Sequence, residues 1–78
     1  MSVRDRVFKV FKATFDFGDE VDTRTLEYRK YAAWTSMGHM VLAAALEEEF
    51  GVMLETEEVL AMSNFDKAVE IMTKHCSH

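Results

Sequence analysis

The chain contains no proline and only three glycines among its 78 residues. The tight turns of β-hairpins depend on these residue types, so their scarcity disfavours an all-β domain built from many short strands. Apolar residues instead recur at helical spacing, for example at Val3, Val7 and Val10. A chain of this length has room for one small domain. We therefore expect a single all-α domain over residues 1–78.

Four segments carry the helical pattern or the residues that begin and end a helix. The expected helices span about residues 3–15, 36–50, 57–62 and 64–75. Gly51 is the expected end of the second helix, and Thr56 and either Ser63 or Asn64 are the expected caps of the last two. Residues 15–34 lack the pattern. We interpret them as a long ordered loop whose aromatic residues, Trp34 among them, anchor it to the helices.

Charge is distributed unevenly along the chain, which has a net charge of −5. Residues 1–31 hold seven Lys/Arg and six Asp/Glu, whereas residues 32–78 hold two Lys/Arg and eight Asp/Glu. The acidic half disfavours nucleic-acid binding and attracts partners with basic patches. We expect no transmembrane segment and no signal peptide, and Cys76 is the single cysteine. We expect a cytoplasmic monomer that does not bind membranes.

Ser36 is the strongest candidate for chemistry, at the expected start of the second helix. Position alone favours a plain helix cap for such a serine. A serine hydrolase would also need a base and an oxyanion hole. His39 is the only histidine on this helix and has no acidic residue at a matching spacing. We therefore predict no catalytic residues and no enzymatic activity for the chain itself.

The residues around Ser36 and along the second half of the chain resemble the acyl carrier protein family. The family's signature is an Asp-Ser-Leu triplet opening a helix that ends in Leu-Glu-Glu-Glu-Phe-Gly. Here the triplet is Thr35, Ser36 and Met37, and residues 46–51 match the helix end. A final helix of the Phe-Asp-Lys-Ala-Val-Glu type matches residues 65–70. The resemblance covers essentially the whole chain and implies that family's four-helix bundle, with three long helices, one short helix and a long first loop.

The resemblance implies that Ser36 carries 4′-phosphopantetheine, transferred from coenzyme A by a phosphopantetheinyl transferase. The thiol of this arm would hold acyl groups as thioesters for enzymes of a fatty-acid, polyketide or specialised lipid or polysaccharide pathway. A helix N-terminus suits a phosphodiester, because free N–H groups and the positive end of the helix dipole lie there. Two positions depart from the signature. Thr35 replaces Asp and removes a charge beside the serine, and Met37 replaces Leu at nearly the same volume.

Partner enzymes are expected to dock beside Ser36. The candidate docking residues are Thr35, Met37, Met40, Val41, Glu47 and Glu48. They indicate a face that is apolar near Ser36 and acidic further along, suited to acyl-transferring enzymes with basic patches. Helical spacing alone makes burial of Met40 and Val41 an equal expectation. The alternative function is an unmodified helical protein–protein interaction module with the same fold.

Three further features are open to more than one interpretation. Glutamates 47–49 crowd the last turn of the second helix, where the helix dipole disfavours acids, so local stability does not explain them. Alanines 43–45 leave room for an acyl chain between helices, or simply favour the helix. His75, Cys76 and His78 are metal-ligating residue types, but they lack a fourth ligand and a rigid frame. We predict no metal site and interpret these three as an incidental tail.

Overall fold

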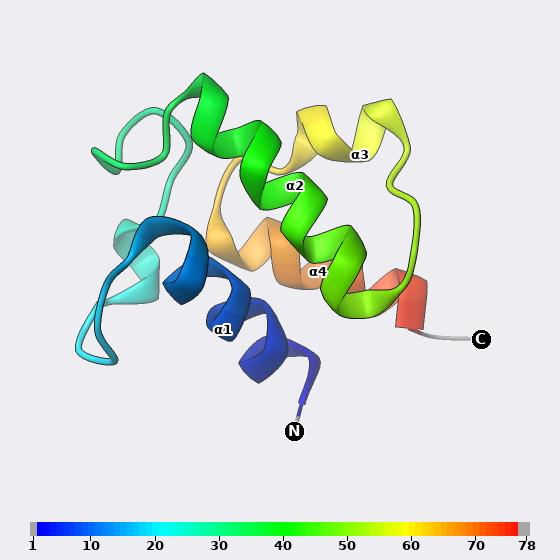
Figure 1. Cartoon of the computed structure of the whole chain (residues 1–78), viewed down its shortest axis with the longest axis horizontal. Helices are drawn as coiled ribbons and strands as arrows, with labels where there is room; N and C mark the ends of the chain where they lie inside the picture. The colour runs from blue at the N-terminus through cyan, green and yellow to red at the C-terminus, as the bar shows by residue number, and fades with distance from the viewer. Residues whose placement is uncertain (1, 77–78) are drawn as a thin grey trace.

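The computed structural model describes residues 2–76 as four α-helices joined by loops, with one turn of 3-10 helix (Figure 1). The elements are α1 (Val3–Phe15), η1 (Thr23–Thr25), α2 (Ser36–Phe50), α3 (Thr56–Ala61) and α4 (Phe65–Cys76). Within these residues the only β-type pairing is an isolated bridge between Glu27 and Asn64. The all-α prediction is therefore confirmed. Helices α1 and α2 coincide with the expected ranges, and α3 and α4 are each displaced by one residue.

Helices α2 and α4 begin at side-chain caps. The Oγ1 of Thr35 accepts the N–H of Gly38 at 3.1 Å. At α4, the Oδ1 of Asn64 accepts the N–H of Lys67 at 2.7 Å. At its other end, α2 stops at Gly51, whose φ of 66° lies in the left-handed region that glycine adopts without strain.

The expected cap of α3 was wrong. Thr56 is the first residue of this helix, and the capping position belongs to Glu55. The backbone N–H of Glu55 donates to the Glu58 carboxylate at 2.9 Å, as in a capping box. The Glu55 side chain in turn accepts the N–H of Glu58, which is the kind of hydrogen bond that a threonine cap was expected to make.

The core lies where α1 packs against α2 and α4 (Figure 1). Its fully buried side chains come from α1, α2, α4, the first loop and Met62, which directly follows α3: Val7, Phe11, Leu26, Trp34, Leu42, Leu46, Met62, Phe65, Ala68 and Met72. Phe11 is the centre of an aromatic cluster, with edge-to-face contacts at 5.1 Å to both Trp34 and Phe65. No helix in the described part of the chain is long and apolar enough to cross a membrane.

The first loop is fixed to the helices at several points. Leu26 and Trp34 are fully buried, so the predicted anchoring by Trp34 is confirmed. The backbone also contributes, because the N–H of Tyr28 donates to the carbonyl of Ser63 at 2.9 Å, and that of Phe65 to the carbonyl of Leu26 at 3.0 Å. This double tie holds the loop against the start of α4 and places residue 28 beside the N-terminus of α2.

Candidate functional site

Ser36 is the first residue of α2, and it is exposed. Its Oγ lies 3.1 Å from the hydroxyl oxygen of Tyr28. The interpretation of Ser36 as a plain cap was wrong, since Thr35 supplies the capping hydrogen bond. The helix therefore begins without using the Ser36 hydroxyl, which faces solvent at the positive end of the helix dipole.

A buried polar pair lies beneath this end of α2. The indole Nε1–H of Trp34 donates to the Nδ1 of His39 at 2.9 Å, and the Nε2 of His39 lies 2.7 Å from the carbonyl oxygen of Val59. An indole N–H can only donate, so Nδ1 must accept, and the ring proton must sit on Nε2 facing that carbonyl. Both nitrogens of His39 are therefore engaged. The residue holds the first loop to α3, and it has no ring nitrogen free to act on Ser36.

Gly38 is a residue that the sequence analysis did not single out. A Cβ at this position would lie 2.8 Å from the carbonyl oxygen of Ala33 and 3.2 Å from the ring of Phe15. Glycine therefore lets the end of the first loop cross directly over the first turn of α2. A glycine inside a helix normally costs stability, and that cost is the only signal in the sequence that a close approach occurs here.

A hollow of about 370 Å³ opens beside Ser36, and Arg29, Thr35 and Met37 contribute to its wall. Arg29 has a left-handed backbone, with φ of 66°. Each of the other three arginines forms an ion pair with a carboxylate. Within residues 2–76, Arg29 is thus the one arginine whose guanidinium has no carboxylate partner, and it lies in the same hollow as the serine hydroxyl.

Three large apolar side chains next to Ser36 face solvent. Met37 is 78% exposed, Met40 65% and Val41 53%. They lie at positions i, i+3 and i+4 on one face of α2, and we call them the apolar stripe. The expectation that Met40 and Val41 are buried was wrong. Ala44 and Glu48 continue the same exposed face toward the end of the helix.

The glutamates at the end of α2 differ from one another in their contacts. The Oε2 of Glu47 accepts the N–H of Leu54 at 2.8 Å, which fixes the loop that leads to α3. Of the two candidate docking acids, Glu47 is therefore half-buried with one carboxylate oxygen engaged, while Glu48 is exposed.

Glu49 faces α1. Its carboxylate accepts from Arg6 at 3.1 Å and pairs with Lys9 at 3.3 Å, while Arg6 also donates to the backbone carbonyl of Glu49 at 2.9 Å. Hydrogen bonds from Arg6 and then from Lys9 hold the pKa of the Glu49 carboxyl below its usual value. Of the three acids that local helix stability did not explain, Glu47 and Glu49 thus have tertiary partners, and the α1 cations offset the unfavourable position of Glu49.

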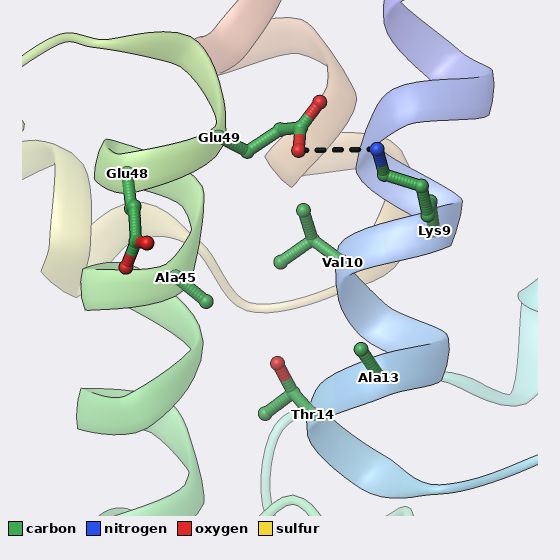
Figure 2. Close-up of a pocket in the computed structure, with 7 residues that line it drawn as sticks. All are labelled: Lys9, Val10, Ala13, Thr14, Ala45, Glu48 and Glu49. Carbon is green, nitrogen blue, oxygen red and sulfur yellow. Dashed lines mark ion pairs between the residues drawn. The ribbon is translucent and has the colours of Figure 1, made fainter.

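A second hollow, of about 350 Å³, lies between α1 and α2 at the end of α2 remote from Ser36 (Figure 2). Its floor is made by short side chains, and the Lys9–Glu49 ion pair spans one end. Of alanines 43–45, only Ala45 lines it, while Ala43 is buried and Ala44 is exposed. The hollow is a shallow groove left by small residues at a helix crossing.

The metal-ligating residue types at the end of α4 do not form a cluster within the described residues. His75 Nε2 lies 2.9 Å from the Glu58 carboxylate and so joins α4 to α3, which corrects its interpretation as part of an incidental tail. The N–H of Glu55 and then His75 lower the pKa of the Glu58 carboxyl. Cys76 is exposed, and His78 lies outside the described residues. Among residues 2–76 no group of three potential metal ligands is brought together.

No family model, curated protein or solved structure matches the chain. What the site can do therefore follows from its own groups. An exposed hydroxyl stands at the N-terminus of a fifteen-residue helix, with an unpaired guanidinium in the adjoining hollow and an apolar stripe alongside. Such a hydroxyl can accept a phosphoryl group, and the positive end of the helix favours the anionic product.

Proposed function

We propose that this chain is an acyl carrier protein with that family's four-helix bundle, and that it carries acyl groups on a 4′-phosphopantetheine arm attached to Ser36. The observation that carries the proposal is the exposed Ser36 hydroxyl, which the start of α2 does not need because Thr35 supplies the cap. When bound, the arm supplies a thiol that holds acyl intermediates as thioesters for enzymes of a fatty-acid, polyketide, lipid or polysaccharide pathway.

In the attachment step the protein contributes only a nucleophilic oxygen. Ser36 Oγ forms a bond to the pantetheine-bearing phosphorus of coenzyme A, and the bond from that phosphorus to the bridging oxygen of the pyrophosphate breaks. Adenosine 3′,5′-bisphosphate leaves, and the hydroxyl proton passes to a base of the phosphopantetheinyl transferase. The product keeps one negative charge. Free N–H groups at the start of α2 and the unpaired guanidinium of Arg29 support that charge.

Partner enzymes dock, in this proposal, on the exposed face of α2. The apolar stripe supplies the contact nearest Ser36, with Thr35 at its edge, and Glu48 supplies an acidic group three turns along. A complementary partner presents an apolar surface with a basic side chain opposite Glu48. Enzymes that recognise a strongly acidic helix would find little charge here, so this carrier serves a dedicated pathway and is a poor substrate for general fatty-acid synthase enzymes.

The test is the intact mass of the protein after incubation with coenzyme A, Mg²⁺ and a broad-specificity phosphopantetheinyl transferase. The wild-type chain gains the mass of one phosphopantetheine, and Ser36→Ala gains none. Ser63→Ala is the matched control, because Ser63 is also exposed and its hydrogen bonds within residues 2–76 are made by backbone atoms. A wild-type chain that stays unmodified under conditions that modify a known carrier would contradict the proposal.

The second candidate function is an unmodified helical interaction module with the same fold. The observation that favours it is the apolar stripe itself, since an exposed group of large apolar side chains marks a binding surface whether or not Ser36 is modified. The mass experiment separates the two functions. The module predicts no mass gain and a partner whose binding is unaffected by Ser36→Ala.

A further inference from the structure

Tyr28 is held firmly by the residues around it. Its backbone N–H donates to the carbonyl of Ser63, and its ring packs at a tilt against the ring of His39, with centroids 4.8 Å apart. Trp34 meets the Tyr28 ring edge-on, with centroids 6.3 Å apart. Backbone and ring are therefore both fixed, and the hydroxyl is the part of the side chain left to interact with Ser36.

The groups beneath Tyr28 are themselves fixed. His39 is buried and hydrogen-bonded through both ring nitrogens, to Trp34 on one side and Val59 on the other. The next residue along the chain, Arg29, donates its N–H to the carbonyl of Trp34 at 2.9 Å and so closes residues 29–34 into a tight loop. A buried, fully hydrogen-bonded platform of this kind gives a side chain one well-defined position.

We propose that Tyr28 is a positioning residue that holds the Ser36 hydroxyl in a single orientation for phosphoryl transfer. A serine χ1 has three staggered wells, and the 3.1 Å hydrogen bond to a fixed phenol selects one of them. Phosphoryl transfer needs the attacking and leaving oxygens roughly in line, so a pre-set oxygen removes one orientational requirement. The inference rests on the proposed function and adds to it a residue that neither the family signature nor the spacing of the sequence points to.

The hydrogen bond is compatible with the attachment step. When the phenol donates to Ser36 Oγ, a second lone pair of that oxygen is left for the phosphorus, and the serine proton points toward solvent, where the base of the transferase removes it. The O–P bond forms, the pyrophosphate bond of coenzyme A breaks, and Tyr28 keeps its own proton throughout. Tyr28 therefore orients the nucleophile and takes no part in bond making.

Tyr28→Phe tests the inference, because it removes only the hydroxyl and keeps the ring on His39. Without the phenol, Ser36 χ1 samples all three staggered wells, so the orientation that the hydrogen bond selects falls to about one third of the population. We therefore expect kcat/KM for modification of Tyr28→Phe to fall about threefold. Tyr31→Phe is the matched control. Tyr31 lies in the same loop and lines the hollow beside Ser36, but its hydroxyl has no hydrogen-bond partner among the described residues. The rate of Tyr31→Phe falls by less than that of Tyr28→Phe, and the melting temperatures of both variants stay close to wild type.

The second readout is the pair of Hα–Hβ NMR couplings of Ser36 in the unmodified protein, which report χ1 directly. Wild type and Tyr31→Phe show the couplings of one staggered well, and Tyr28→Phe shows averaged couplings. Averaged couplings in the wild type, or a Tyr28→Phe rate equal to or above wild type, overturn the inference. A wild type that is never modified contradicts the proposed function instead, and the couplings then decide the role of Tyr28 by themselves.

Discussion

The two ends of α2 use their side chains in opposite ways. At the N-terminal end, the large apolar residues of the stripe are exposed, and Tyr28 is the one hydrogen-bond partner of the Ser36 hydroxyl among the described residues. At the C-terminal end, the charged residues Glu47 and Glu49 are half-buried and bound to the α2–α3 loop and to α1. The end that is rich in apolar residues is exposed to solvent, and the end that is rich in charged residues is partly buried.

This difference shows that residue polarity does not locate the free surface of so small a domain. Carboxylates at a helix C-terminus are unfavourable alone, and they persist here where cations of α1 or a free backbone N–H meet them. Exposed apolar side chains have no such internal explanation. They carry a cost in solubility that a binding role accounts for, so the N-terminal end is where a partner is expected.

The largest expected effect lies beneath the open end. Trp34→Ala removes a fully buried indole that packs on Phe11 and donates to His39, so it leaves both a cavity and an unsatisfied buried nitrogen. We expect the free energy of unfolding to fall by about 3–5 kcal/mol, measured by urea denaturation. Such a loss is a large part of the stability of a domain of this size. A loss below about 1 kcal/mol would mean that the open end has no rigid support.

Gly38→Ala is expected to have the next largest effect. The sign of its change in the free energy of unfolding distinguishes a close approach of the first loop from an ordinary helix position. In an ordinary exposed helix this change stabilises by about 0.5–1 kcal/mol. Here the new Cβ meets the carbonyl oxygen of Ala33 at 2.8 Å, so we expect a loss of about 1–3 kcal/mol in urea or thermal unfolding. Ala44→Gly, at an exposed position of the same helix, is the control and shows only the ordinary propensity change. A stabilised Gly38→Ala variant would show that the first loop does not cross α2 closely.

Much of the fold was predictable because the signals that begin and end helices are local. Periodic apolar residues and the stop at Gly51 act within one or two turns, and the expected ranges of α1 and α2 follow from them. The side of α2 that faces the core was not predictable in this way. This helix has apolar residues on every side, so spacing alone could not separate exposed Met40 from buried Leu42.

The contacts of the candidate site depend on tertiary structure, and the sequence holds little trace of them. Tyr28 reaches Ser36 across an irregular loop, so no fixed spacing relates the two. The sequence does not distinguish consecutive glutamates from one another, yet Glu48 is exposed while Glu49 contacts α1. The position of Ser36 at the start of α2 could be predicted from the sequence, because helix starts are local features.

The acidic end gives a pH-dependent prediction of intermediate size. The pKa of Glu49 is lowered from 4.5 by hydrogen bonds from Arg6 and Lys9, so in acid the unfolded chain takes up this proton before the folded one does. The stabilisation is therefore present above pH 4.5 and is lost as the pH falls through the folded-state pKa. Urea unfolding across this range should show a weaker acid dependence for Glu49→Gln than for wild type.

The control for the acidic end is Glu48→Gln, which removes an exposed carboxylate from the same turn. We expect this variant to keep the pH dependence of the wild type. An equal change in both variants would mean that Glu49 contributes no more than general surface charge, and the contrast between the two ends of α2 would then rest on the apolar stripe alone.

The smallest effect on stability is expected for the stripe itself. Met40→Ser and Val41→Ser each alter the free energy of unfolding by no more than about 0.5 kcal/mol, because these side chains face solvent. If the stripe docks the transferase, KM for the carrier rises while kcat is retained, the pattern of lost binding without lost chemistry. Leu42→Ser, one residue away but fully buried, instead destabilises the fold. Unchanged KM in both stripe variants would separate modification of Ser36 from the stripe and leave these residues for a different partner.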